Sequence, residues 1–276
     1  MDIKKLLKIE KTGRISAALF LIALLLRILS SVFMTDGRTG FAIPEYRVWS
    51  IVINLASAAF AAGGVIFMGR HVKFSPNGIS PDILLALISA AVAVLSVKEG
   101  FTTESAATHQ QWQIALVQVF GMLNAVFFFA YAISGIFGVK LPRLVFAIPL
   151  VHSMIRLVRF FAVTTSITVI TDNIFSLIFD CIFIFFMLHF ANVANAIGGK
   201  TSVKKLRIYG YAAFSSSMLC SIPRLAKLIC DSNAKAHESI VSTVFSLVLG
   251  LFALVLTFNV FDKKKKKADN NTESIS

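Results

Sequence analysis

The chain has 276 residues, of which 57% are hydrophobic and only 15% are charged. Soluble globular domains contain about 25% charged residues, so this composition excludes a protein whose whole surface faces water. The net charge of +13 does not indicate a nucleic-acid partner, because the basic residues form short clusters between apolar runs and no nucleic-acid-binding motif is present. The sequence instead predicts an all-α protein embedded in the lipid bilayer.

Eight apolar runs follow one another along the chain. A helix needs about 20 mostly apolar residues to cross a hydrocarbon core about 30 Å thick. The first run is too long for the core of a signal peptide, so we expect it to remain as a membrane anchor. The predicted spans form one transmembrane domain over 15–261 and cover residues 15–34, 48–69, 81–98, 113–138, 143–164, 173–197, 206–230 and 239–261.

The distribution of Lys and Arg predicts the orientation. With both termini in the cytoplasm, the cytoplasmic segments carry 18 of these residues and the opposite loops and helix ends carry six. Such an excess is typical of cytoplasmic loops. Residues 1–14 are expected to form a basic cytoplasmic or interfacial segment. Residues 262–276, which include Lys263 to Lys267, are expected to form a disordered tail attracted to anionic lipid.

Several charged residues lie inside the predicted spans, where each costs about 2.5–3.5 kcal/mol at the bilayer centre. At 1.5 Å per residue, five basic residues lie roughly 5–12 Å from the outer helix ends: Arg27, Arg156, Arg159, Arg224 and Lys227. Asp180 lies at a similar depth, about 10 Å. Because one carboxylate cannot neutralise five bases, the pattern predicts a cation-rich pocket in the outer leaflet.

The fifth span presents its polar residues as one stripe. His152, Arg156 and Arg159 are spaced i, i+4, i+7, which places them on a single helix face. The structural alternative is that Asp180 neutralises one arginine while the others reach outward to lipid phosphates. For His189 we weigh a buried, hydrogen-bonded histidine against a proton relay through Asp180 and His152.

Motifs for catalysis and for cofactors are missing from the sequence. Cys181, Cys220 and Cys230 have no metal-binding spacing. The sequence contains no phosphate-binding P-loop, no HExxH and no GxSxG. We therefore predict no catalytic residue, no metal and no cofactor.

Weak internal repetition predicts that the spans are arranged as helical hairpins. HSMIRLVRFF at 152–161 aligns with CSIPRLAKLI at 220–229, so that Arg156 corresponds to Arg224. WSIVINL at 49–55 resembles WQIALVQ at 112–118. We expect one hairpin unit, used four times in the same orientation, around an axis along the membrane normal.

The C-terminal half also carries a resemblance. A proline-containing helix with RLVRFF is followed by DNIFSLIFDCIFIFFMLHFANVANAIG, the basic loop GGKTSVKKLR and the RLAK helix. This order of elements looks like a group of uncharacterised eight-span membrane proteins of anaerobic Gram-positive bacteria. The resemblance implies an eight-span fold in a bacterial plasma membrane, and it implies no activity.

The charged layer suggests a function. We expect a transport or small-ligand-binding protein that holds an anionic solute or a lipid headgroup. The expected site residues are Arg27, Arg156, Arg159, Arg224, Lys227 and His152, with Asp180 as counter-ion. One alternative is an accessory subunit whose arginines contact a partner membrane protein. A second alternative is an intramembrane enzyme that modifies lipid.

Overall fold

The computed structural model describes residues 11–37, 39–71, 83–102, 111–139, 141–164, 171–197, 199–231 and 239–259. The polybasic tail and most of the basic N-terminal segment lie outside these residues, as do the loop residues Lys73, His109 and Lys235. Within the described part the protein is helical and has no strand, apart from an isolated bridge between Thr35 and Ala42.

Each predicted apolar run overlaps one α helix. A helix satisfies every internal backbone hydrogen bond within its own segment, which is why apolar runs adopt it where water is absent. The α helices are α2 (Lys11–Phe33), α3 (Arg47–His71), α4 (Ile83–Thr102), α5 (Gln111–Phe137), α6 (Ile148–Thr164), α7 (Thr171–Ala194), α8 (Gly199–Cys230) and α9 (Ile240–Asn259). Two short 3-10 helices, η1 (Pro44–Tyr46) and η2 (Arg143–Ala147), precede α3 and α6.

Seven helical segments in the described part are long and apolar enough to cross a membrane. They are α2, α4, α5, α7 and α9, together with α3 extended by η1 and α6 extended by η2. Large apolar side chains face outward on several of them, including Leu25, Val48, Leu87 and Val126. Water would not favour such a surface, whereas lipid does. The protein is therefore a multi-pass membrane protein.

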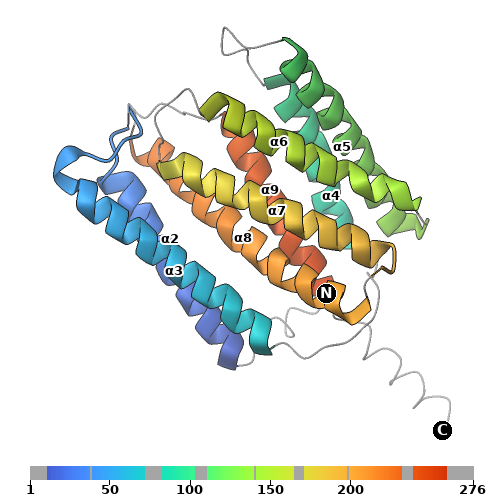
Figure 1. The fold of residues 1–276 in the computed structure, drawn as a ribbon, viewed down its shortest axis with the longest axis horizontal. Coiled ribbons are helices and arrows are strands. Elements are labelled where there is room, and N and C mark those ends of the chain that lie inside the picture. Colours follow the sequence, from blue (N-terminus) through green and yellow to red (C-terminus); the bar gives the residue numbers. More distant parts are fainter. Residues whose placement is uncertain are drawn as a thin grey trace.

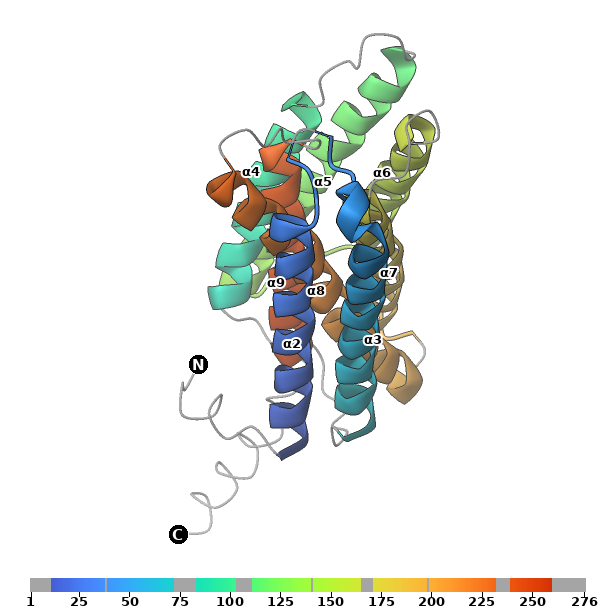
Figure 2. The same ribbon diagram turned by 90° about the vertical axis from the view of Figure 1, so that its left-hand side faces the viewer.

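The helices run side by side in one bundle. Figure 1 shows α2 and α3 as a pair on one side, α7, α8 and α9 in the middle, and α4, α5 and α6 on the other side. α8 occupies the centre, because it packs against α7, α9, α2 and α3. In Figure 2, α2 begins at the end of the bundle where α3 ends.

The central helix α8 is more polar than its neighbours, and its hydroxyl groups bond to α9. The Ser217 hydroxyl donates to the main-chain oxygen of Ser246 at 2.7 Å, and Ser221 donates to that of Thr243 at 3.1 Å. The helices approach so closely that a Cβ atom at Gly250 would lie 2.4 Å from the side chain of Ser217. Small residues and interhelical hydrogen bonds of this kind hold membrane helices together.

An aromatic core fills the half of the bundle in which α5, α7 and α9 end. Its members include Phe127, Tyr131, Phe186, Phe190 and Phe252, all of them buried. The Tyr131 ring packs edge-on against Phe190, with 5.6 Å between the ring centroids. Most of the buried charged residues lie toward the opposite end, whereas Arg207, near the start of α8, is buried in this half.

Candidate functional site

Seven of the charged residues in the bundle form two groups that share helix α7. The first, the arginine–lysine group, consists of Arg27, Arg224 and Lys227 around Asp172. The second, the α6 group, consists of Arg156 with Glu99 and Asp180. Asp172 and Asp180 are eight residues apart on α7, about 12 Å along the helix axis. The structure therefore separates the predicted site residues into two places.

Arg27 is the most deeply buried of these bases, with 1% of its side chain exposed. Its Nη2 atom forms an ion pair with the carboxylate of Asp172. Its Nη1 atom donates to Oδ1 of Asn54 at 3.2 Å, and the guanidinium lies over the ring of Phe175, 4.5 Å from the centroid. Among the described residues, the Nε–H of Arg27 has no acceptor.

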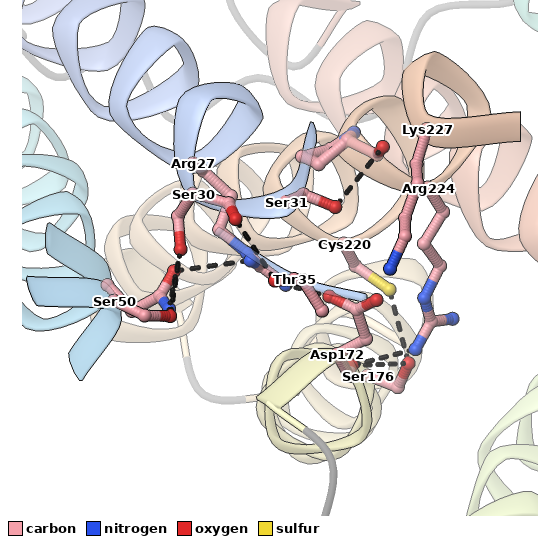
Figure 3. A network of polar contacts seen from close by, with 12 residues as sticks. Arg27, Ser30, Ser31, Thr35, Ser50, Asp172, Ser176, Cys220, Arg224 and Lys227 are labelled. Atoms are coloured by element: carbon pink, nitrogen blue, oxygen red, sulfur yellow. Dashed lines mark hydrogen bonds and ion pairs between the residues drawn. The ribbon is translucent and has the colours of Figure 1, made fainter. Parts of the chain in front are cut away.

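Helix α8 supplies the other two bases of the arginine–lysine group. Arg224 donates from Nη2 to the main-chain oxygen of Asp172 at 2.7 Å. Lys227 donates from Nζ to the main-chain oxygen of Asp36 at 3.0 Å, and it also interacts electrostatically with Asp172 and Asp231. Figure 3 shows Arg27, Arg224 and Lys227 pointing toward Asp172 from α2 and α8. Three bases thus surround one carboxylate within the bundle.

Polar side chains complete the surroundings of this group (Figure 3). The Asn54 amide donates to the Ser30 hydroxyl at 3.0 Å, and the hydroxyls of Ser30 and Ser50 are 3.2 Å apart. On the other side, the Ser176 hydroxyl lies 3.2 Å from the Cys220 thiol. These contacts fix the orientation of Arg27 and Asp172, because buried polar atoms are costly unless they are paired.

A depression lies beside the group, at the same end of the bundle. It has a volume of about 600 Å³ and is lined by residues between 32 and 44, in the connection from α2 to α3, and by Asp231 at the end of α8. We call it the rim depression. Asp36, whose main-chain oxygen accepts from Lys227, is part of its wall. The wall of the rim depression therefore contacts the arginine–lysine group through this hydrogen bond.

The α6 group connects four helices through a single arginine. Arg156 lies 3.5 Å from Glu99 through Nε and 3.5 Å from Asp180 through Nη2. It also donates to the Ser246 hydroxyl at 3.3 Å, while Ser242 donates to Glu99 at 3.2 Å. These partners come from α4, α7 and α9, so the group links α6 to all three.

The remaining predicted residues lie on α6. His152 is 3% exposed and packs edge-on toward the ring of Phe245, with 6.2 Å between centroids. Arg156 lies over the same ring at 5.0 Å. Arg159 follows on the same helix face and is half-buried. His189 stacks on Tyr209 at 5.3 Å, nine residues from Asp180 on α7, so these side chains do not make the direct contact that the relay alternative requires.

The expectation of one internal carboxylate was wrong, because Asp172 and Glu99 also pair with the buried bases. Each lies one residue outside a predicted span, so the span boundaries alone assign both residues to loops. Helix α4 continues to Thr102, which brings Glu99 inside the bundle with 7% exposure. The acid at the start of DNIFSLIF was the one sequence signal that could have identified Asp172.

Comparison of the chain with protein-family models, with curated proteins and with solved structures found no match. The resemblance to uncharacterised eight-span proteins therefore stays a prediction. Among the described residues, no group of three His, Cys, Asp or Glu side chains could hold a metal ion.

Proposed function

We propose that this protein binds a small anionic solute or a lipid headgroup at the arginine–lysine group, and that it carries this ligand across a bacterial plasma membrane. The observation that supports this function is the convergence on Asp172 of two buried bases, Arg27 and Lys227, and of the partly buried Arg224. Asp172 is the carboxylate that all three bases share, while Asp36 and Asp231 act on Lys227 at the end of the group. Ionisable side chains are expensive inside a membrane, and they mark substrate paths in many membrane proteins.

Asp172 acts in this proposal as a tethered anion. It occupies the position that the acidic group of the ligand takes, and the ligand competes with it for the bases. Arg27 offers a further donor to the incoming ligand, because its Nε–H has no acceptor among the described residues. Guanidinium groups bind carboxylates and phosphates through two parallel hydrogen bonds, which suits such an exchange.

The proposal includes an eighth span, formed by α8. This helix has 32 residues, about 48 Å at 1.5 Å per residue, which exceeds the thickness of the hydrocarbon core. Its hydroxyl and basic groups are tolerable there because the neighbouring helices α2, α3, α7 and α9 surround it.

Eight spans place both termini on one side, which we propose is the cytoplasm. The two charged groups then lie in the outer leaflet. A reporter fused after Ser276 should be active only in its cytoplasmic form. A reporter read as external would contradict this orientation and would move the charged groups to the inner leaflet.

The hairpin repeat is a further part of the proposal. In the repeat alignment Arg156 corresponds to Arg224, and each of these residues contacts an aspartate residue of α7. Arg156 contacts the side chain of Asp180, whereas Arg224 contacts the main-chain oxygen of Asp172. Two related hairpins would thus have diverged, one toward support of the bundle and the other toward ligand binding.

Native mass spectrometry of the full chain in detergent tests the function. We expect wild type to retain phosphate or phosphatidylglycerol as a specific adduct. The folded Arg27→Gln/Arg224→Gln variant should lose this adduct, and the matched Arg156→Gln variant should keep it. If all three proteins carry the same adducts, or none, then the anion site does not exist, and the bases are structural, as in an accessory subunit.

A further inference from the structure

We infer that the ligand is an oxyanion that presents two oxygen atoms to one edge of the Arg27 guanidinium, and that Asn54 makes the site select such a ligand over a halide ion. This inference rests on the proposed function, because it specifies the ligand of the same site. The chemistry is that of a phosphate or carboxylate group. The arrangement that carries it is a buried guanidinium edge on which one of two donors has no acceptor among the described residues.

The edge in question, which we call the Nε edge, carries the Nε–H and one N–H of Nη2. These two groups are parallel in a guanidinium, and together they match two oxygens of a carboxylate or a phosphate. Nη2 of Arg27 forms the ion pair with Oδ1 of Asp172, but the Nε–H has no acceptor in the described part of the chain. A ligand that offers two oxygens therefore satisfies a buried donor that Asp172 leaves unused.

Two contacts besides the ion pair fix the direction of the Nε edge. Nη1 of Arg27, on the other side of the guanidinium, donates to Oδ1 of Asn54 at 3.2 Å. The Asn54 amide donates in turn to the hydroxyls of Ser30 at 3.0 Å and Ser50 at 3.3 Å. The ring of Phe175 lies against the plane of the guanidinium, 4.5 Å from its central carbon. The Nε edge thus stays directed at the carboxylate position on α7 when the carboxylate leaves.

The Asp172 carboxylate can leave the Nε edge without releasing Arg224. Arg224 donates to the main-chain oxygen of Asp172, whereas Arg27 binds the side chain. Within the described residues, the hydrogen bond from Arg27 is the one that the carboxylate accepts. The Asp172 side chain is also 15% exposed, against 1% for Arg27. A rotation of the Asp172 side chain would therefore free both donors of the Nε edge while Arg224 stays bound.

A halide ion gains less from the Nε edge than an oxyanion does. A halide is a single atom, whereas the two parallel donors of a guanidinium suit two acceptor atoms. Binding of a halide depends on the charge of the bases and changes little when the guanidinium turns. Loss of Asn54 should therefore lower the affinity for oxyanions and leave the affinity for halides unchanged.

NMR spectroscopy of the full chain in detergent, with isotope label at the arginine Nε atoms, tests the binding mode. The Arg27 Nε–H resonance is assigned by its absence from the spectrum of Arg27→Lys. We expect phosphate and acetate to move this resonance downfield, because the Nε–H gains an acceptor, and we expect bromide to leave it in place. The Arg156 resonance, assigned with Arg156→Lys, is the internal control and should not move.

The Asn54→Ala variant tests the selectivity. We expect wild type to bind phosphate about tenfold more tightly than bromide, and we expect Asn54→Ala to lose this preference through a fall of about tenfold in phosphate affinity alone. The matched control is Asn124→Ala, which removes another buried asparagine whose amide donates to a serine, Ser96, at 2.9 Å. This control should keep the preference. If Asn54→Ala does not fold, the Arg27 resonance of wild type decides.

The outcomes separate this inference from the proposed function. If phosphate binds without moving the Arg27 resonance, or if bromide binds as tightly as phosphate, the selective Nε edge is refuted while the anion site stands. If phosphate, acetate and bromide all fail to bind and no phospholipid is retained, both are refuted. A shift of the Arg27 resonance with phosphate supports a soluble ligand. A shift with phosphatidylglycerol alone supports the same oxyanion chemistry on a lipid headgroup.

Discussion

The two charged groups are built from the same residue types on a shared helix, and yet their charge balance differs. In the α6 group, Arg156 lies between the carboxylates of Glu99 and Asp180 and also bonds to Ser246. In the arginine–lysine group, three bases surround the carboxylate of Asp172, and Asp36 and Asp231 act on Lys227 as well. A base that lies between two carboxylates connects helices, whereas we propose that a carboxylate surrounded by three bases can be exchanged for another anion. Buried ion pairs can therefore serve opposite purposes within one bundle.

Removing the charge of Asp172 should have the largest effect on stability. Asp172→Asn leaves three bases without their common counter-ion, and breaking a buried pair costs about 3–5 kcal/mol. We expect a clear fall in the midpoint of thermal unfolding in detergent. Asp172→Glu, which keeps the charge, serves as the control and should recover most of the loss. An unchanged midpoint in Asp172→Asn would show that the bases do not depend on this carboxylate.

Arg156→Met should lower the free energy of unfolding by less, about 2–3 kcal/mol. Without Arg156, the carboxylates of Glu99 and Asp180 can relieve their mutual repulsion when one of them takes up a proton. The triple variant Arg156→Met/Glu99→Gln/Asp180→Asn should regain most of the stability, since no buried charge is left unpaired. Anion binding should be unchanged in both. A loss of phosphate binding in the folded triple variant would remove the distinction between the groups.

The contact between α8 and α9 joins the helices of the two groups. Ser217 of α8 donates to the main-chain oxygen of Ser246 on α9, and the Ser246 hydroxyl accepts from Arg156. Gly250→Ala would place a Cβ atom 2.4 Å from the Ser217 side chain, so we expect a loss of about 1–3 kcal/mol from overpacking. Gly135→Ala is the matched control, since its Cβ would lie 3.7 Å from Ala86, an ordinary contact. Equal unfolding midpoints for the two variants would show that α8 and α9 do not pack closely at Gly250.

Arg27→Lys should have the smallest effect on stability, because it keeps the charge beside Asp172. It removes the planar guanidinium and its Nε donor, and it should weaken phosphate binding about tenfold. Arg156→Lys should leave the affinity for phosphate unchanged. If both variants bind phosphate as wild type does, the geometry of the Arg27 guanidinium plays no part in binding.

The helical fold followed from hydrophobicity alone, because eight apolar runs are visible along the chain and each overlaps a helix. The position of each base along its helix could also be predicted from the sequence, through the rise of 1.5 Å per residue. The partners of these bases could not be predicted. Glu99 and Asp172 lie at the edges of apolar runs, and only the packing of α4 against α9, and of α2 and α7 against α8, decides that they face inward.

The division of the charged layer into two groups could not be predicted either. Arg156 and Arg224 occupy equivalent positions in the repeat, and the sequence gives no reason to assign them different partners. The difference arises from the neighbours of α6 and α8 in the bundle. α6 packs against α5 and α7, whereas α8 is surrounded by α2, α3, α7 and α9. Contacts between distant segments of this kind are not encoded in the periodicity of either helix.

Phosphate rescue of Asp172→Asn tests most directly whether Asp172 occupies the place of a ligand anion. The midpoint of thermal unfolding would be measured against phosphate, at constant ionic strength set with chloride, for Asp172→Asn and for Asp180→Asn. The account predicts that phosphate restores much of the stability lost in Asp172→Asn and leaves Asp180→Asn unchanged. Equal responses of the two variants would contradict it, because phosphate would then not distinguish the arginine–lysine group from the α6 group.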